Sequence, residues 1–198
     1  MNAERSETLR KAVREKYRSV SGRPGGHFPY PVGRESALRL RYDRAWLAAV
    51  PAPVVDRFVG VGNPFSIRKP APGERVLDVG CGCGLDAFVS SLLVGPRGRV
   101  AGLDSTPEML RWPRKALARC KTHNLEFVEG SIEDPPFERR SFDLIFSNGV
   151  LNLVPDKDRA FRRLYGLLRP GGIFAAADLV VVEDVPPEVL ADPDAWST

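Results

Sequence analysis

Residues 76–84, Val-Leu-Asp-Val-Gly-Cys-Gly-Cys-Gly, constrain the fold more than any other part of the chain. A short apolar run leads into a loop with glycine at every second position, and a helix pattern begins directly after the loop. Glycine lets the backbone turn tightly and lets a ligand approach without obstruction by a Cβ atom. The dinucleotide pattern would require a glycine where the chain has Leu85, and no phosphate-binding Lys-Ser or Lys-Thr pair follows. The segment therefore predicts a ligand site of another kind at the end of a buried strand.

Short apolar runs alternate with amphipathic stretches from residue 73 onward. The predicted strands are residues 75–79, 99–104, 125–129, 142–147 and 173–182. The predicted helices are residues 85–94, 107–121 and 156–168. Strands that alternate with helices indicate βαβ units, a parallel sheet and right-handed crossovers. The pattern predicts an α/β protein with a Rossmann-like core.

The first 57 residues have a different sequence pattern from the alternating strands and helices that follow. Residues 7–18 fit a helix with Leu9, Val13 and Tyr17 at four-residue spacing. Residues 21–33 hold four glycines and three prolines, which excludes a regular helix or strand. We therefore expect an N-terminal helical or lid segment over residues 1–57, a core over 58–184 and a tail over 185–198.

Composition narrows the class of protein. The chain is 43% hydrophobic and 27% charged, as in a globular domain, and no apolar run approaches the ~18 residues of a membrane span. Basic residues crowd the N-terminal third, but without interleaved base-stacking aromatics we interpret them as a solvated surface rather than a nucleic-acid site. The N-terminus lacks the apolar region of a signal peptide, and the cysteine count of three is odd. We expect a cytoplasmic protein without membrane span or disulfide framework.

An acidic residue, Asp104, ends the next predicted strand, 20 residues beyond Gly84. A carboxylate in this place can accept hydrogen bonds from both hydroxyls of a ribose. The alternative is that Asp104 caps the helix that begins at Pro107. The loop and the acid occur together at the expected separation, which favours a nucleoside ligand.

These motifs resemble those of class I S-adenosylmethionine-dependent methyltransferases. Residues 76–84 resemble the first motif of that family, 102–110 the second, 142–148 the fourth, and 168–172 the turn before strand five. The resemblance covers residues 58–184. It implies a Rossmann-like methyltransferase core, S-adenosyl-L-methionine as cofactor and transfer of its methyl group.

The resemblance also implies contacts to the methionine part of the cofactor. Four loop residues would surround it: Gly80, Cys81, Gly82 and Gly84. Asp78 would orient the loop or the ammonium group of the cofactor. Asn148, after the fourth strand, would lie beside the sulfonium.

The adenosine part is assigned in the same way. Asp104 would take the ribose, and Ser105 and Met109 would flank the adenine. Many relatives have an acid directly after the third strand, where this chain has a serine. The adenine edge is assigned to the three residues that begin there: Ser131, Ile132 and Glu133.

Within the family, the chain is most similar to the arsenite methyltransferase group, through residues 60–64, 84–88, 105–109, 147–153 and 186–190. In that group cysteine thiolates hold arsenic(III), because a soft ion prefers soft ligands. One such cysteine follows the Ser-Asn of the fourth motif, where this chain has Gly149. The N-terminal segment contains none. The scaffold therefore matches and the arsenic ligands do not.

Three functions remain open: a methyltransferase for a small-molecule acceptor, a metalloid methyltransferase with an altered thiolate set, and a cofactor-binding domain without catalysis. The candidate acceptor-site residues are His27, Tyr30 and Asn152. Cys81 and Cys83 are interpreted as small packing residues, because two sulfurs do not complete a metal site, and no metal is expected. No catalytic base is assigned, because proximity alone can drive transfer from an activated sulfonium.

The resemblance implies seven strands in a complete core, but the residues after strand five do not predict two more. They contain Pro186, Pro187 and Pro193, and proline disfavours a sheet interior. We therefore expect a core without its last two strands. Strand five would be an open edge, which a second copy of the chain or the N-terminal segment could cover.

Overall fold

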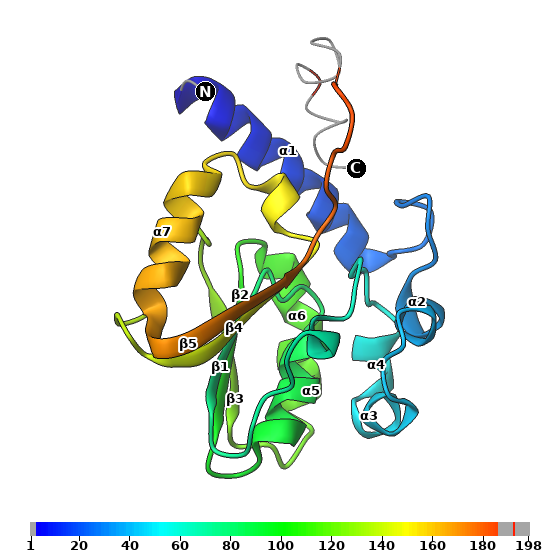
Figure 1. Ribbon diagram of the computed structural model, residues 1–198. Helices are drawn as coiled ribbons and strands as arrows, with labels where there is room; N and C mark the ends of the chain where they lie inside the picture. The colour runs from blue at the N-terminus through cyan, green and yellow to red at the C-terminus, as the bar shows by residue number, and fades with distance from the viewer. Residues whose placement is uncertain (1–2, 186–191, 193–198) are drawn as a thin grey trace.

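The computed structural model describes residues 3–185 and residue 192 (Figure 1). It contains one five-stranded sheet with the strand order β3-β2-β1-β4-β5, in which every neighbouring pair is parallel. The strands are β1 (Arg75–Val79), β2 (Arg99–Asp104), β3 (Leu125–Glu129), β4 (Phe142–Asn148) and β5 (Leu168–Ala177). The predicted α/β class and the Rossmann-like core are confirmed.

Helices cover both faces of the sheet. Figure 1 shows α5 (Leu85–Val94) and α6 (Pro107–Leu117) on one side and α7 (Lys157–Leu167) on the other. Successive strand residues point to opposite faces. Accordingly, Val76 packs in the apolar cluster that contains α5, while its neighbour Leu77 packs in the cluster that contains α7.

Between residues 3 and 57, the part of the N-terminal segment that the structure describes, there are four α-helices. They are α1 (Ala3–Gly22), α2 (Gly33–Arg39), α3 (Arg44–Ala49) and α4 (Ala52–Val55). α1 is longer than predicted, and α2, α3 and α4 were not predicted at all. Tyr42, Leu47 and Val54 belong to the same apolar cluster as β1 and α5, so this segment packs against the core. In Figure 1, α1 lies across the end of the sheet where the strands terminate.

The predicted strand over residues 173–182 is wrong in both bounds. β5 begins at Leu168, which is in register with Phe142 of β4 despite an irregularity in the pairing, and it ends at Ala177 opposite Asn148. Asp178 then accepts hydrogen bonds from residues 150–152, which ends the pairing. Residues 179–182 continue the apolar pattern but are exposed. The apolar pattern therefore misplaced the end of the strand.

The other predicted helices and strands agree closely with those observed in the structure. α6 ends at Leu117 rather than at residue 121, because residues 118–120 close with turn hydrogen bonds. Cys81, Cys83 and Cys120 are free thiols in the structure. Within the described residues β5 pairs with β4 alone, and no helix there has the length and apolar character to cross a bilayer. Most of the predicted tail lies outside the described residues.

Candidate functional site

A cavity of about 420 Å³ opens at the carboxyl ends of the parallel strands. Ligands of open α/β sheets bind at this end, near the point where the strand order reverses, here between β1 and β4. We call the part formed by the loops after β1, β2, β3 and β4 the strand-end wall. α1 closes the opposite side with five residues, which we call the α1 cover: Glu7, Arg10, Val13, Arg14 and Tyr17.

The glycine loop after β1 shapes the floor of the cavity. Gly80 and Gly82 have φ angles of 65° and 52°, which side chains disfavour. A Cβ atom at Gly80 would lie 2.3 Å from Cγ2 of Val150, and one at Gly82 would lie 3.2 Å from Cε of Met109. The loop therefore needs glycine both for its backbone conformation and for its close contacts.

Asp104, at the end of β2, fastens this loop. Its Oδ2 accepts a hydrogen bond from the Gly82 amide at 2.8 Å, and its Oδ1 accepts one from the Thr106 amide at 2.8 Å. Burial raises the pKa of Asp104 to about 6, although these amide hydrogen bonds oppose the shift. The carboxylate also lines the cavity. Asp104 therefore does not cap the helix that begins at Pro107, whose N-cap residue Thr106 makes no side-chain capping hydrogen bond, and it combines local backbone hydrogen bonds with a position on the cavity wall.

One carboxylate oxygen of Asp78 is buried and makes no hydrogen bond with the described residues. The residue is 2% exposed, and its Oδ2 has no hydrogen-bond partner among the described residues. Burial raises the pKa of Asp78 well above its usual value, and the nearby carboxylates of Asp86 and Asp104 add to the shift. Three buried carboxyl groups beside one cavity favour a ligand with positive charge.

Asn148, at the end of β4, is the centre of a second network. Its Oδ1 accepts the amides of Val61 and Gly62 at 2.9 and 3.0 Å. Its Nδ2 donates to Oδ2 of Asp86 at 2.9 Å and to the Tyr42 hydroxyl at 3.1 Å. The Tyr42 hydroxyl in turn donates to Oδ1 of Asp86 at 2.6 Å. Asn148 thus ties the 60–62 loop to the cavity. Tyr42 and Asp86, the other two members of this network, were not predicted from the sequence.

An ion pair joins the α1 cover to the strand-end wall. Arg10 donates from Nε and Nη2 to the carboxylate of Glu133 at 2.7 and 2.9 Å. Glu133 has a side chain that is only 7% exposed, so this pair is better shielded than the Arg18–Glu108 pair farther along α1. The four-residue spacing on α1 predicted a helix, but nothing in it indicated which surface the helix covers.

The structure brings together all predicted cofactor residues except Gly84. A Cβ atom at Gly84 would lie 2.8 Å from the Phe127 ring and 2.9 Å from Cβ of Pro113. Gly84 therefore allows α5 to pack closely on the sheet and α6, and it does not face the cavity.

The three predicted acceptor residues do not line the cavity. Nε2 of His27 lies 3.5 Å from the Ser19 hydroxyl. Tyr30 stacks on Phe28 with 5.1 Å between the ring centroids. The amide nitrogen of Asn152 donates to Asp178, and its buried Oδ1 has no partner within the described residues. The tyrosine that does line the cavity is Tyr17, whose ring lies 6.3 Å from that of Phe28.

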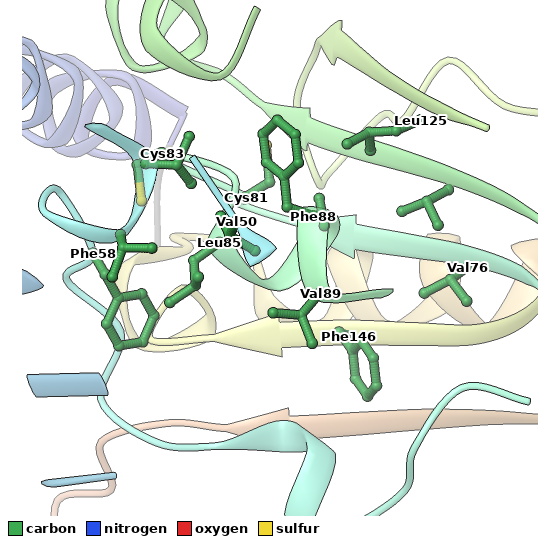
Figure 2. Close-up of a cluster of buried hydrophobic side chains, with 14 of the residues drawn as sticks. Val50, Phe58, Val76, Cys81, Cys83, Leu85, Phe88, Val89, Leu125 and Phe146 are labelled. Atoms are coloured by element: carbon green, nitrogen blue, oxygen red, sulfur yellow. The ribbon is translucent and has the colours of Figure 1, made fainter. Parts of the chain in front are cut away.

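The loop thiols sit among apolar side chains. Figure 2 shows Cys81 and Cys83 in the cluster that contains Leu85 and Phe88. Burial raises the pKa of Cys81 well above its usual value and that of Cys83 to about 12. Neutral thiols are weak metal ligands. The described residues contain no cluster of His, Cys, Asp and Glu that could hold a metal ion.

Residues 70–198 match the family model described as a methyltransferase domain. The chain belongs to this family. The prediction of a class I S-adenosylmethionine-dependent methyltransferase similar to the arsenite group is confirmed.

Related proteins and solved structures agree with this family assignment. The chain is 38% identical to an arsenite methyltransferase of Halobacterium salinarum, over 96% of this chain and 52% of that protein. It is 36% identical to a demethylmenaquinone methyltransferase of Listeria monocytogenes, over 58% of this chain and 48% of that protein. A crystal structure of an arsenic(III) S-adenosylmethionine methyltransferase from Chlamydomonas reinhardtii has a TM-score of 0.69 and 41% identity, covering 76% of this chain and 52% of that one. The chain thus spans about half the length of these proteins.

The cavity suits the cofactor of this family. S-adenosylmethionine is a nucleoside that carries a sulfonium and an ammonium group. The Oδ2 of Asp78, which no described residue contacts through a hydrogen bond, offers an acceptor for positive charge, and the glycine backbone leaves room where Cβ atoms would clash. Asp104 stands at the strand end where a ribose is held in such folds. The donor set therefore fits the predicted cofactor.

Proposed function

We propose that this chain binds S-adenosyl-L-methionine in the cavity beneath α1 and transfers its methyl group to a small-molecule acceptor. The observation that carries the proposal is the buried Oδ2 of Asp78 beside the glycine loop, which has no hydrogen-bond partner in the described part of the chain. The methionine part lies along Gly80, Cys81 and Gly82 in this proposal. Met109 and residues 131–133 enclose the adenine, with Asp104 on the ribose.

The chain's own groups act mainly by placement. The cofactor supplies an electrophilic methyl group with a neutral leaving group. Holding an acceptor in line with that methyl group can supply ~7–11 kcal/mol of the barrier. Asn148 uses both ends of its amide on internal partners, so it shapes the wall rather than moving a proton. We assign no general base.

Titration calorimetry with S-adenosylmethionine, followed by methyl-transfer assays on a panel of small acceptors, tests the proposal. Saturable binding at one site and turnover on a panel member support it. Binding without turnover on any acceptor favours a cofactor-binding domain without catalysis. No binding at all contradicts the proposal.

Arsenite is the second candidate acceptor, because the arsenite methyltransferases above are among the relatives of this chain. Two features oppose it. Gly149 stands where the group has a cysteine, and burial keeps the thiols of Cys81 and Cys83 protonated. An arsenic(III) ion needs several converging thiolates. We therefore expect this chain to be a poor arsenite methyltransferase.

The arsenite assay compares the chain with its Cys81→Ser/Cys83→Ser variant, in the presence of cofactor and a small thiol. Methylated arsenic formed at ~1 per second or faster, and lost in the double variant, would show that the loop cysteines hold the metalloid. Slow or absent methylation in both proteins is the expected result.

A cytoplasmic location and a homo-oligomer that covers the β5 edge stay part of the proposal. The exposed apolar side chains of Ile173 and residues 179–182 support contact with another surface. Cell fractionation tests the location, and light scattering after gel filtration tests the oligomer. A monomer at all concentrations would contradict the second expectation.

A further inference from the structure

Residues 149–155 follow β4 and form the part of the cavity wall next to Asn148. Gly149, Val150, Leu153 and Val154 all line the cavity. Val150 packs directly on the glycine loop, because its Cγ2 lies 2.3 Å from the place where Gly80 would carry a Cβ atom. The position of this segment therefore sets the shape of the cavity and supports the loop.

One carboxylate, that of Asp178, holds the start of this segment. Its Oδ2 accepts the amides of Val150 and Leu151 at 3.2 and 2.7 Å, and its Oδ1 accepts the amide of Asn152 at 3.3 Å. These amides begin the 3₁₀ turn Leu151–Leu153, which has no side-chain cap of its own. The first amides of a helical turn have no partner within the turn, and a carboxylate can accept several of them.

Strand register brings Asp178 to this place. Ala177 is the partner of Asn148 in the β4–β5 pair, and the Gly149 amide donates to the Ala177 carbonyl at 2.8 Å. The residue after Ala177 therefore stands beside the residues after Gly149. Because β5 ends at Ala177, Asp178 can turn its side chain toward the segment.

Lys157, at the start of α7, holds the other end of the segment. Its Nζ donates to the carbonyl oxygens of Asn152 and Val154 at 3.3 and 2.9 Å. The Asp178 carboxylate thus accepts hydrogen bonds from the backbone amides of the turn, and the Lys157 ammonium group donates hydrogen bonds to its backbone carbonyls. Both residues lie outside the cavity lining, so their contacts act through the segment.

We propose that Asp178 is a positioning residue of the methyl-transfer site, which keeps Val150 against the glycine loop by fixing the amides of residues 150–152. The inference rests on the proposed function, since it assigns Asp178 a role in holding the cofactor loop. In the absence of Asp178, Val150 moves away from Gly80 and the cofactor loses part of its enclosure.

The experiment measures S-adenosylmethionine affinity by calorimetry and amide hydrogen exchange of residues 150–152, in the wild type and in Asp178→Ala and Asp178→Asn. Asp178→Ala should raise the dissociation constant about tenfold, equivalent to about 1.4 kcal/mol, and should speed exchange of these amides. Asp178→Asn keeps one carbonyl oxygen and should recover part of both losses. The matched control is Asp143→Ala, which removes a carboxylate that accepts the Arg75 amide at the other end of β4. It should leave affinity and exchange unchanged.

The outcomes separate the two proposals. A wild-type protein that fails to bind the cofactor contradicts the proposed function, whereas the exchange measurement still tests the contact of Asp178 with the turn. Wild-type affinity and wild-type exchange in Asp178→Ala would overturn the inference. If that variant does not fold, Asp178→Asn and Lys157→Met take its place. Unchanged affinity and exchange in both would overturn the inference equally.

Discussion

The strand-end wall and the α1 cover enclose the same cavity, but they are encoded differently. In the strand-end wall, the ends of neighbouring parallel strands place Asp78, Gly80 and Asp104. Each of these residues belongs to a short sequence motif that indicates its position. In the α1 cover, Arg10 meets Glu133 across 123 positions of sequence. The contrast teaches that a site built on sheet register can be read from local motifs, whereas its cover depends on long-range contacts.

The largest effect should follow from a change in the strand-end wall. Gly80→Ala places a Cβ atom 2.3 Å from Val150 at a φ angle of 65°. Overpacking of this kind costs ~1–3 kcal/mol before backbone strain is added, so we expect S-adenosylmethionine affinity to fall about 100-fold.

The matched control for this change is Gly73→Ala. Gly73 also has a positive φ, of 88°, but a Cβ atom there meets nothing within 4 Å. Its cofactor affinity should stay at the wild-type value while stability falls slightly. Equal loss of affinity in both variants would mean that strain in general, rather than the shape of the glycine loop, governs binding.

Asp104→Ala should have the second largest effect. The change removes the acceptor of the Gly82 amide and the carboxylate proposed to meet the ribose. Hydrogen bonds to a charged group contribute ~1.5–3 kcal/mol, so the dissociation constant should rise about tenfold to 100-fold in calorimetry. An unchanged constant would end the ribose assignment.

Acidification should weaken cofactor binding through the same wall. Burial raises the pKa of Asp86 and Asp104 from 3.8 to about 6. A cationic ligand favours their ionised forms, so affinity should fall as the pH drops from about 7 to about 5. Affinity that is constant over this range would contradict the electrostatic role of the wall.

Without ligand the same groups act on stability in the opposite direction. Between pH 4 and pH 6 the folded protein binds more protons at these carboxyls than the unfolded chain does. Their contribution to the free energy of unfolding therefore falls as the pH rises through this window, by about 1.4 kcal/mol per pKa unit. Asp104→Asn should reduce this slope in urea denaturation measured at several pH values.

The smallest effect should come from the α1 cover. Arg10→Ala removes the ion pair with Glu133, whose arginine is 29% exposed. Partly exposed pairs contribute at most ~1 kcal/mol, so cofactor affinity should fall about two- to fivefold. Arg39→Ala breaks the exposed Arg39–Glu35 pair on α2 and should change nothing. A loss as large as that of Asp104→Ala would mean that the cover contributes as much as the strand ends.

The sequence allowed the sheet and most of the strand-end wall to be predicted, because glycine spacing and strand-end acids are local signals. Gly84 was assigned to the cofactor by resemblance to the first motif of the family, but the contacts with Phe127 and Pro113 that explain it come from distant elements. Tyr42 and Asp86 were missed for the same reason. Their hydrogen bond spans 44 positions, and although Asp86 belongs to the 84–88 stretch that resembles the arsenite group, nothing local in the sequence indicates its partner.

The N-terminal side of the cavity was the hardest part to predict. His27 and Tyr30 were proposed because the corresponding N-terminal segment of relatives closes over the active site; neither lines the cavity, whereas Tyr17 of the preceding helix does. A helix pattern shows which residues share a face and not what that face meets. The prediction of a strand over 173–182 was wrong because residues 179–182 are as apolar as β5 itself. Only the contacts of Asp178 show where the strand pairing stops.

Hydrogen exchange with and without S-adenosylmethionine is the decisive measurement for the proposed cofactor site, because it locates the cofactor on the chain. Saturating cofactor should slow amide exchange in the glycine loop at 80–84, in residues 104–109 and 131–133, and in α1 between Arg10 and Tyr17. Protection confined to other segments, or absent from both the glycine loop and α1, would contradict the assignment of the cofactor to the cavity between the strand-end wall and the α1 cover.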